Sequence, residues 1–198
     1  MKRLNSTTSW LIVVTFSIGF LYQTAGTANA QMPQPTEHHK LLLKDVGTWN
    51  ASVKSWVGDD GTMLDEPTMT TGTEKNYMVG GFWMVGEYEG KFYGQPFTGR
   101  STMGYDMEKK QFVGSWIDSF SPSAMTMTGK WNKEKNTMTW ETLGMGMDGK
   151  PTKGKSVQEY KEDGTRVFSM YSAMPGHDKL QKVMEMTYTK VKSTKGEK

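Results

Sequence analysis

The sequence predicts an all-β protein: a single antiparallel up-and-down barrel of about ten strands with a short N-terminal helix. Three observations support this fold class. From Gly47 onward apolar and polar residues alternate with a period of two, which is typical of half-buried strands. Turn-forming residues interrupt the alternation at short intervals along the chain. No helical segment long enough for a crossover lies between the strands, so we expect antiparallel pairing.

Residues 1–30 have the pattern of a secretory signal peptide. Lys2 and Arg3 make a cationic start, and an apolar run follows over residues 10–22. That run is shorter than the roughly 20 apolar residues needed to span a bilayer. The small residues at 28–30 match the kind of cleavage site that signal peptidase accepts. We therefore expect cleavage before Gln31 and a periplasmic or secreted product without a stable membrane anchor after signal cleavage.

Composition narrows the function classes for the remaining chain. Without the two basic residues of the signal, 22 Lys and Arg stand against 21 Asp and Glu, so no basic face for nucleic acid is predicted. The chain has no cysteine, which excludes disulfides, a thiol nucleophile and a thiolate metal site. No cofactor is predicted, because the chain has no Gly-rich phosphate loop.

We expect a linker at residues 31–35, the barrel at 36–192 and a polar tail at 193–198. Thr36 is a plausible N-cap for a helix that Gly47 ends. His38 and His39 are adjacent in its first turn and point in different directions. We therefore predict exposed histidines rather than metal ligands.

Turn residues divide the barrel into its strands. A link at 58–68 that contains Pro67 is expected to hang over the barrel mouth. Strands are predicted at residues 49–57, 69–79, 82–90, 97–106, 111–120, 125–131, 137–143, 153–161, 165–174 and 180–191.

The two faces of these strands differ sharply. Thr, Lys and Glu occupy one face, and Met and aromatic residues occupy the other, which predicts a Met- and aromatic-rich interior. Methionine suits irregular apolar ligands, and barrels of this strand number commonly enclose one ligand. A cavity for a small hydrophobic ligand and a filled core both remain open. The predicted lining is Trp49, Met84, Tyr88, Met103, Tyr105, Trp116, Asp118, Met125, Met127, Trp140, Met170, Met186 and Tyr188.

Two other functions remain as alternatives. Asp118 is two residues from Trp116 and lies on the same face of the strand. Its carboxylate is therefore placed among aromatic side chains, unless it is solvated at the strand end. Paired with Tyr105 it would give a barrel enzyme an acid/base couple. The pairs at 125/127 and 145/147 would instead give methionine sulfurs to a copper ion in a periplasmic copper-binding protein. No histidine is near them in sequence, so no metal ligand is assigned.

Motifs along the chain resemble a bacterial family catalogued as domain of unknown function 1579, whose fold is lipocalin-like. The matching stretches lie at 39–41, 46–49, 80–83, 96–99, 104–106, 115–118 and 184–189, in order. The Gly47-x-Trp49 entry also resembles the lipocalin and fatty-acid-binding superfamily, where that tryptophan closes the barrel base. The resemblance implies fold rather than activity. It also implies a polar cluster built on arginines, weakened here by Lys190 and by the lack of a basic residue near Val157.

Overall fold

The computed structural model describes residues 32–146 and 149–192, and ten antiparallel strands in these ranges close into a barrel. The predicted fold class is confirmed. Helix α1 (Glu37–Leu41) and a 3-10 turn, η1 (Leu42–Lys44), precede the first strand. The strands are β1 (Gly47–Val57), β2 (Met63–Val79), β3 (Trp83–Phe92), β4 (Gln95–Asp106), β5 (Gln111–Asp118), β6 (Met125–Asn132), β7 (Thr137–Met145), β8 (Pro151–Tyr160), β9 (Arg166–Ser172) and β10 (Gln181–Lys190).

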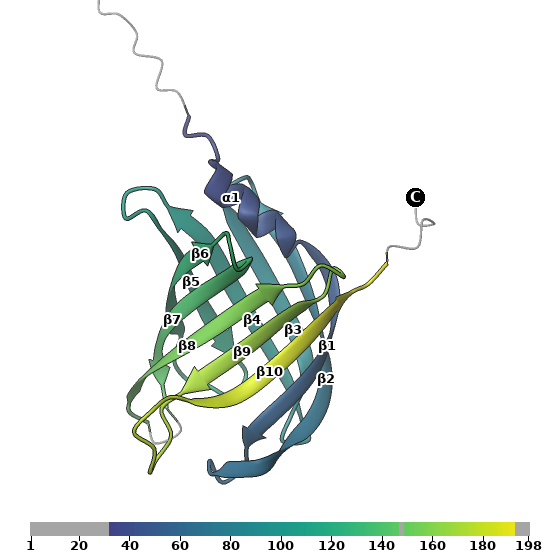
Figure 1. The fold of residues 1–198 in the computed structure, drawn as a ribbon, viewed down its shortest axis with the longest axis vertical. Helices are drawn as coiled ribbons and strands as arrows, with labels where there is room; N and C mark the ends of the chain where they lie inside the picture. Colours follow the sequence, from purple (N-terminus) through teal and green to yellow (C-terminus); the bar gives the residue numbers. More distant parts are fainter. Residues whose placement is uncertain (1–31, 147–148, 193–198) are drawn as a thin grey trace, which may run out of the picture. The chain divides into compact units, whose positions relative to one another are not determined.

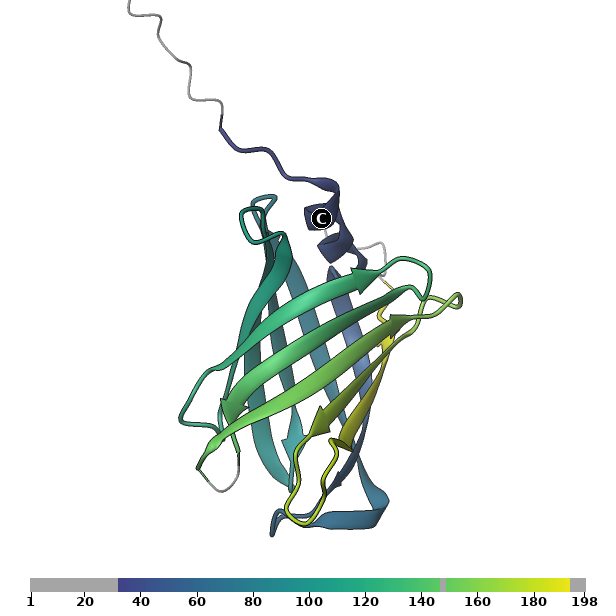
Figure 2. The same cartoon turned by 60° about the vertical axis from the view of Figure 1, so that its left-hand side comes forward.

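Each strand pairs with its neighbour in sequence, and the pairing of β1 with β10 closes the barrel. Trp49 on β1 stands opposite Glu74 on β2 and Lys190 on β10. The strands run obliquely around the barrel, and α1 lies across the end where β1 begins (Figures 1 and 2). We call this the helix end and the opposite end the mouth. Strands β1, β3, β5, β7 and β9 end at the mouth, and the strand that follows each of them begins there.

The N-terminal helix is anchored through its own histidine. Thr36 caps α1, and Nδ1 of His39 accepts a hydrogen bond from the Thr36 backbone N–H at 3.0 Å. His39 is only 2% exposed, so the predicted exposure of this histidine is wrong. Its ring packs edge-on against Phe82 and Tyr105, at centroid distances of 5.2 and 5.7 Å. Burial is possible because the capping bond satisfies one ring nitrogen.

Strand β2 begins earlier than the sequence indicated. Residues 63–68, predicted as part of a link over the mouth, belong to this strand. The β1–β2 register shifts between Ser55 and Val57, where Ser55 pairs with Thr68 but Val57 pairs with Met63. Pro67 lies inside this irregularity, where its missing N–H leaves no ladder bond unmade. The turn signal of the proline therefore marked a bulge and not a loop.

Buried apolar side chains form two groups inside the barrel. One contains Leu42 and Met84 and lies under the helix, together with Phe112, Met127, Met138 and Trp140. The other is centred on Trp49 and Tyr88, with Ala51, Val53, Met186 and Tyr188. Trp116 packs against both groups. The interior is therefore lined by methionine and aromatic residues, as the alternation predicted.

The predicted signal peptide lies outside the described residues, and export stays a prediction. Within residues 32–146 and 149–192, no helix is long and apolar enough to cross a membrane.

Candidate ligand-binding interior

The strand register places all thirteen predicted lining residues at inward-facing positions. Seven of them are buried, and the other six remain partly exposed although they face inward. The buried seven are Trp49, Met84, Tyr88, Met127, Trp140, Met186 and Tyr188. The partly exposed six are Met103, Tyr105, Trp116, Asp118, Met125 and Met170.

Glycines on the inner wall let the large rings lie close to the strands. A Cβ added at Gly99 would stand 2.1 Å from the indole of Trp116, and one at Gly129 would stand 2.6 Å from Trp140. Each glycine is on the strand next to its ring. Gly129 pairs directly with Trp140, and Gly99 is two residues from Ser101, the partner of Trp116. The rings therefore occupy space that other residues would fill with their own side chains.

A charged cluster that the sequence analysis missed lies inside the helix end. The Arg166 guanidinium donates to Asp45 Oδ1 at 2.8 Å and to Glu74 Oε1 at 2.5 Å. It also lies over the rings of Trp49 and Tyr188, at 4.2 and 4.3 Å from their centroids. The resemblance implied a weakened arginine cluster, and Arg166 corrects that expectation because it supplies the guanidinium from β9.

Neutral donors complete the coordination of Asp45. Gln158 Nε2 donates to Oδ1 at 2.7 Å, and the Tyr160 hydroxyl donates to Oδ2 at 2.9 Å. Burial raises the pKa of Asp45, while Arg166 and the Tyr160 hydrogen bond act to lower it. The Trp49 indole N–H donates to the Asp45 backbone carbonyl at 2.8 Å, which joins the cluster to the tryptophan of the first strand.

The alternation of residues along β9 is the sequence signal that would have identified Arg166 as an inward-facing residue. Met170 belongs to the predicted inward lining, and Arg166 lies four residues before it on the same face of the strand. The Arg166 side chain is only 3% exposed although it lies at the start of its strand. Burial follows because two carboxylates and two aromatic faces surround it.

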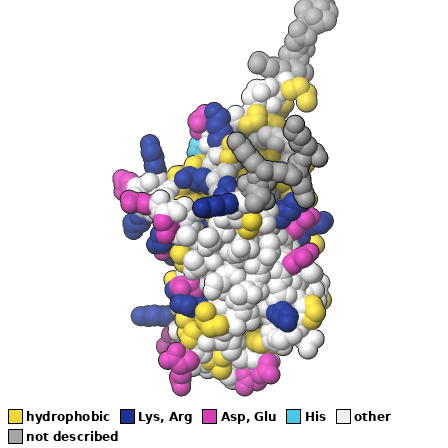
Figure 3. Space-filling model, turned by 90° about the vertical axis from the view of Figure 1, so that its right-hand side faces the viewer, with side chains coloured by type: hydrophobic (Ala, Val, Ile, Leu, Met, Phe, Trp, Pro, Cys, Tyr) yellow, Lys and Arg dark blue, Asp and Glu magenta, His cyan; other side chains and the backbone are white. Residues whose placement is uncertain are grey.

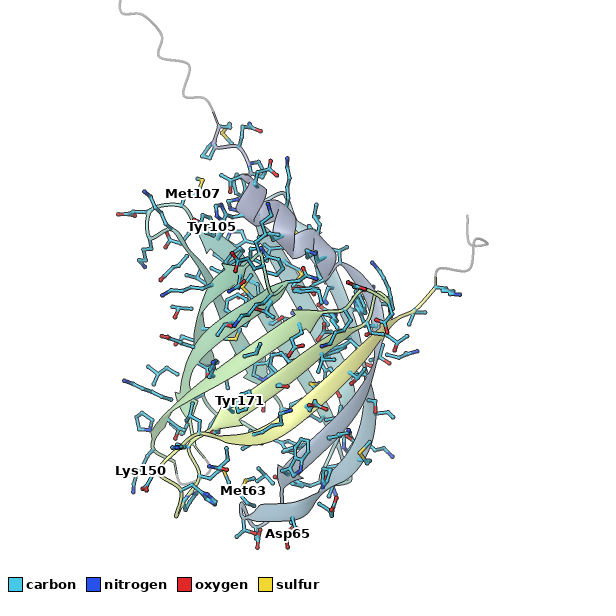
Figure 4. The ribbon with its side chains drawn as sticks, viewed as in Figure 1. Met63, Asp65, Tyr105, Met107, Lys150 and Tyr171 are labelled. Carbon is cyan, nitrogen blue, oxygen red and sulfur yellow. The ribbon has the colours of Figure 1, made fainter. Side chains whose placement is uncertain are left out.

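Asp118 and Tyr105 do not form the predicted acid/base pair. Asp118 pairs with Gly99 near the mouth, and six residues of β4 separate that point from Tyr105, a span of about 20 Å. Figure 4 shows Tyr105 at the helix end, where its ring stacks on His38 at a centroid distance of 4.2 Å. The alternative of an enzyme that uses this pair is therefore not supported.

The oxygens of Asp118 have structural partners. Oδ2 accepts from the Trp116 indole N–H at 2.9 Å, and Oδ1 accepts from the backbone N–H groups of Phe120 and Ser121 at 2.9 and 2.8 Å. Strand β5 ends here, two residues before its predicted end, and Phe120 is 47% exposed. The carboxylate thus turns the chain out of the strand and fixes the indole of Trp116.

The first methionine pair lies on one strand face, as the alternation predicted. Met125 and Met127 face inward from β6, whereas Met145 faces outward from β7 and is 46% exposed. Met147 lies outside the described residues. The Met145 sulfur accepts a hydrogen bond from the Ser123 hydroxyl. The predicted shared face is therefore confirmed for Met125 and Met127, whereas the pair at 145/147 lies only partly within the described residues.

Two solvent-open hollows lie on the outer wall of the barrel. The first, of about 470 Å³, is lined by residues of β1, β2 and β10 such as Asn50, Thr71 and Thr187. Figure 3 shows this side of the barrel, and the middle of the face carries mainly side chains that are neither hydrophobic nor charged. The second, of about 360 Å³, lies across β6, β7 and β8. Neither hollow includes the aromatic residues predicted to line a site.

Comparisons with known proteins agree with this architecture. Residues 34–190 match a family model described as "Protein of unknown function (DUF1579)". No curated protein matches the sequence. Among solved structures, Rv2717c from M. tuberculosis has a similar fold, with a TM-score of 0.58 at 10% sequence identity, and the match covers 80% of this chain and 100% of Rv2717c. At that identity the similarity concerns the fold alone.

Proposed function

Because this chain belongs to the DUF1579 family, whose function is unknown, we propose a function from its own residues: an exported protein that binds a small apolar or amphipathic molecule inside its barrel. The export part rests on residues 1–30. The binding part rests on the character of the inner wall near the mouth.

The supporting observation is that apolar side chains face inward near the mouth without being fully buried. Met170 and Met184 pair across β9 and β10, and Phe97 on β4 stacks on Trp116 of the neighbouring β5. All four face inward and are partly exposed. Inward aromatic and methionine side chains of a closed core would be expected to lose nearly all contact with solvent.

An aromatic group continues this lining to the rim of the mouth. Phe97 lies 5.8 Å from Phe92 and 5.6 Å from Phe120, measured between ring centroids. Tyr88 is 6.0 Å from Phe97 on the inner side. The exposed ring of Phe120, the half-buried rings of Phe92 and Phe97 and the partly exposed methionines behind them would give a ligand an apolar path into the barrel. Methionine is flexible enough to move aside for a ligand of irregular shape.

A filling substitution tests the proposal. Met170→Trp adds bulk at a partly exposed inward position and should abolish binding of N-phenyl-1-naphthylamine, an uncharged fluorescent probe. If the position borders open space, the free energy of unfolding should stay within about 1 kcal/mol of the wild type, because overpacking of a closed core typically costs about 1–3 kcal/mol. Probe fluorescence measures binding, and urea denaturation measures stability.

Met69→Trp is the matched control, because Met69 faces outward on β2 and is 59% exposed. This variant should bind the probe as the wild type does. If the wild type does not bind the probe and Met170→Trp unfolds more easily, the interior is a filled core and the proposed function is wrong.

A further inference from the structure

The charged groups inside the barrel already have partners within the protein. Among the described residues, the inward register positions carry four ionisable charges, on Glu74, Asp118, Arg166 and Lys190. Arg166 is held by Glu74 and by Asp45 from the helix segment. The Asp118 oxygens accept three hydrogen bonds at the mouth.

Lys190 does not supply a free internal cation. It is exposed at the end of β10, and its Nζ lies 5.2 Å from the centroid of the Trp49 ring, at the helix end. At the inward positions of the described strands, a carboxylate or phosphate would therefore find only Arg166, which contacts two carboxylates, and Lys190, which lies over Trp49. It would also approach a cluster with two carboxylates and one guanidinium. Desolvating an unpaired charge under these conditions is strongly unfavourable.

Two buried polar atoms of the inner wall have no hydrogen-bond partner within the described residues, the Ser156 hydroxyl and Arg166 Nε. Arg166 Nε belongs to a guanidinium whose other two nitrogens already contact two carboxylates, so the Ser156 hydroxyl is the uncharged group left for a ligand. Ser156 on β8 is 1% exposed, and its hydroxyl makes no hydrogen bond within the described residues. It lies between Trp140 on β7 and Met170 on β9, both inward. Buried hydroxyl groups in native proteins are usually hydrogen-bonded, so an unpartnered one in an apolar wall suits a ligand oxygen.

On the basis of the proposed function, we propose that the ligand is uncharged, with a long apolar body and one hydrogen-bonding oxygen that meets the Ser156 hydroxyl. A long-chain alcohol, aldehyde or ketone has this chemistry. Its apolar body lies along the methionine and aromatic lining toward the mouth, and its oxygen lies beside Met170. A fatty-acid anion is disfavoured because the Arg166 cluster already has two carboxylates for one guanidinium. An alkylammonium cation is disfavoured because the inward carboxylates already accept hydrogen bonds and its charge would be desolvated without a dedicated partner.

A series of molecules with one chain length tests the charge preference. 1-Dodecanol, dodecanoate and dodecyltrimethylammonium are titrated at pH 8 against the bound N-phenyl-1-naphthylamine, below their micelle concentrations. Dodecanol should displace the probe at a concentration at least about tenfold lower than either ion, since burying an unpaired charge costs several kcal/mol. Equal or tighter binding of an ion overturns the inference and leaves the proposed function intact. Failure of both the probe and every dodecyl compound to bind overturns the proposed function itself.

Ser156→Ala tests the position of the oxygen. Loss of one hydrogen bond should weaken dodecanol binding by about fivefold. Displacement by dodecane, which has no oxygen, should be unchanged. Ser52→Ala is the control, because Ser52 faces outward and is exposed on β1. If Ser156→Ala binds dodecanol as tightly as the Ser52→Ala control does, Ser156 does not contact the ligand oxygen.

Discussion

At the residue scale, Arg166 joins parts of the chain that are far apart in sequence. It connects Asp45 before the first strand to Glu74 on β2 and lies between the rings of Trp49 and Tyr188. Burial acts to lower the pKa of Arg166, but the two carboxylates outweigh it and raise that pKa. The cluster is therefore held by mutual pairing, and removing one member leaves charge buried without a partner.

We predict that Arg166→Met lowers the free energy of unfolding by about 3–5 kcal/mol, because Asp45 and Glu74 then lose their buried counter-charge. Urea denaturation followed by tryptophan fluorescence measures the loss. Arg100→Met is the control, since the Arg100–Glu87 pair lies on the surface with side chains 58% and 35% exposed. Surface pairs contribute about 0–1 kcal/mol, so this variant should be nearly neutral. Similar losses for the two variants would contradict the role given to the cluster.

At the element scale, α1 and η1 are too short to be stable alone and depend on contacts at the barrel end. Leu42 is 2% exposed in the core group below the helix, and His39 is buried against Phe82 and Tyr105. Burial lowers the pKa of His39 from its ordinary value of 6.5. A proton on Nδ1 would also remove the acceptor for the Thr36 backbone N–H.

The lowered pKa of His39 predicts a loss of stability in mild acid. As pH falls through 6.5, the unfolded chain takes up a proton that the folded chain still excludes, so the free energy of unfolding decreases until the folded pKa is passed. Thermal unfolding between pH 7.5 and 5 measures this decrease.

His39→Gln should reduce that decrease, because glutamine at this position preserves the capping interaction and does not titrate. His177→Gln is the control, since His177 lies in the β9–β10 loop at the mouth, far from α1. It should leave the decrease unchanged. An undiminished decrease in His39→Gln would show that another group causes it.

At the scale of the whole molecule, the barrel has its two ends built differently. The helix end holds α1 and the Arg166 cluster, and the mouth carries the aromatic side chains of Phe92, Phe97 and Phe120 on the side of β3, β4 and β5. Figure 4 shows Met63 and Asp65 at the end opposite Tyr105. A ligand that enters this barrel would therefore pass the mouth, because charged and capping interactions hold the other end together.

The predicted export has a direct test on the whole chain. Expressed in a Gram-negative bacterium, the protein should appear in the periplasmic fraction with an N-terminus at Gln31, since residues 1–30 have the features of a cleaved signal. Intact mass and N-terminal sequencing of the purified protein measure this. Lys2 and Arg3 both replaced by Glu should reduce export. A full-length product in the cytoplasmic fraction would contradict the prediction.

The sequence by itself determined the fold class and the side of the wall on which each residue lies. Side chains alternate along a strand regardless of its partners, so Met127, Trp140 and Met186 were assigned inward correctly from local pattern alone. The up-and-down order of the barrel strands followed from the recurring turns, because consecutive antiparallel strands usually pair with their neighbours in sequence. The exact strand ends near Pro67 and Phe120 did not follow, since a bulge and a side-chain-capped turn use the same residue types as loops.

Only the tertiary structure decided which polar residues meet. Asp45 and Arg166 are 121 residues apart, and their contact requires the helix segment to fold over a closed barrel. The burial of His39 depends in the same way on Phe82 and Tyr105, which belong to later parts of the chain. Periodicity indicates the face of the strand on which a side chain lies. Which ionic groups meet, and which hydroxyl groups such as that of Ser156 stay without a partner, depends on the register of the strands.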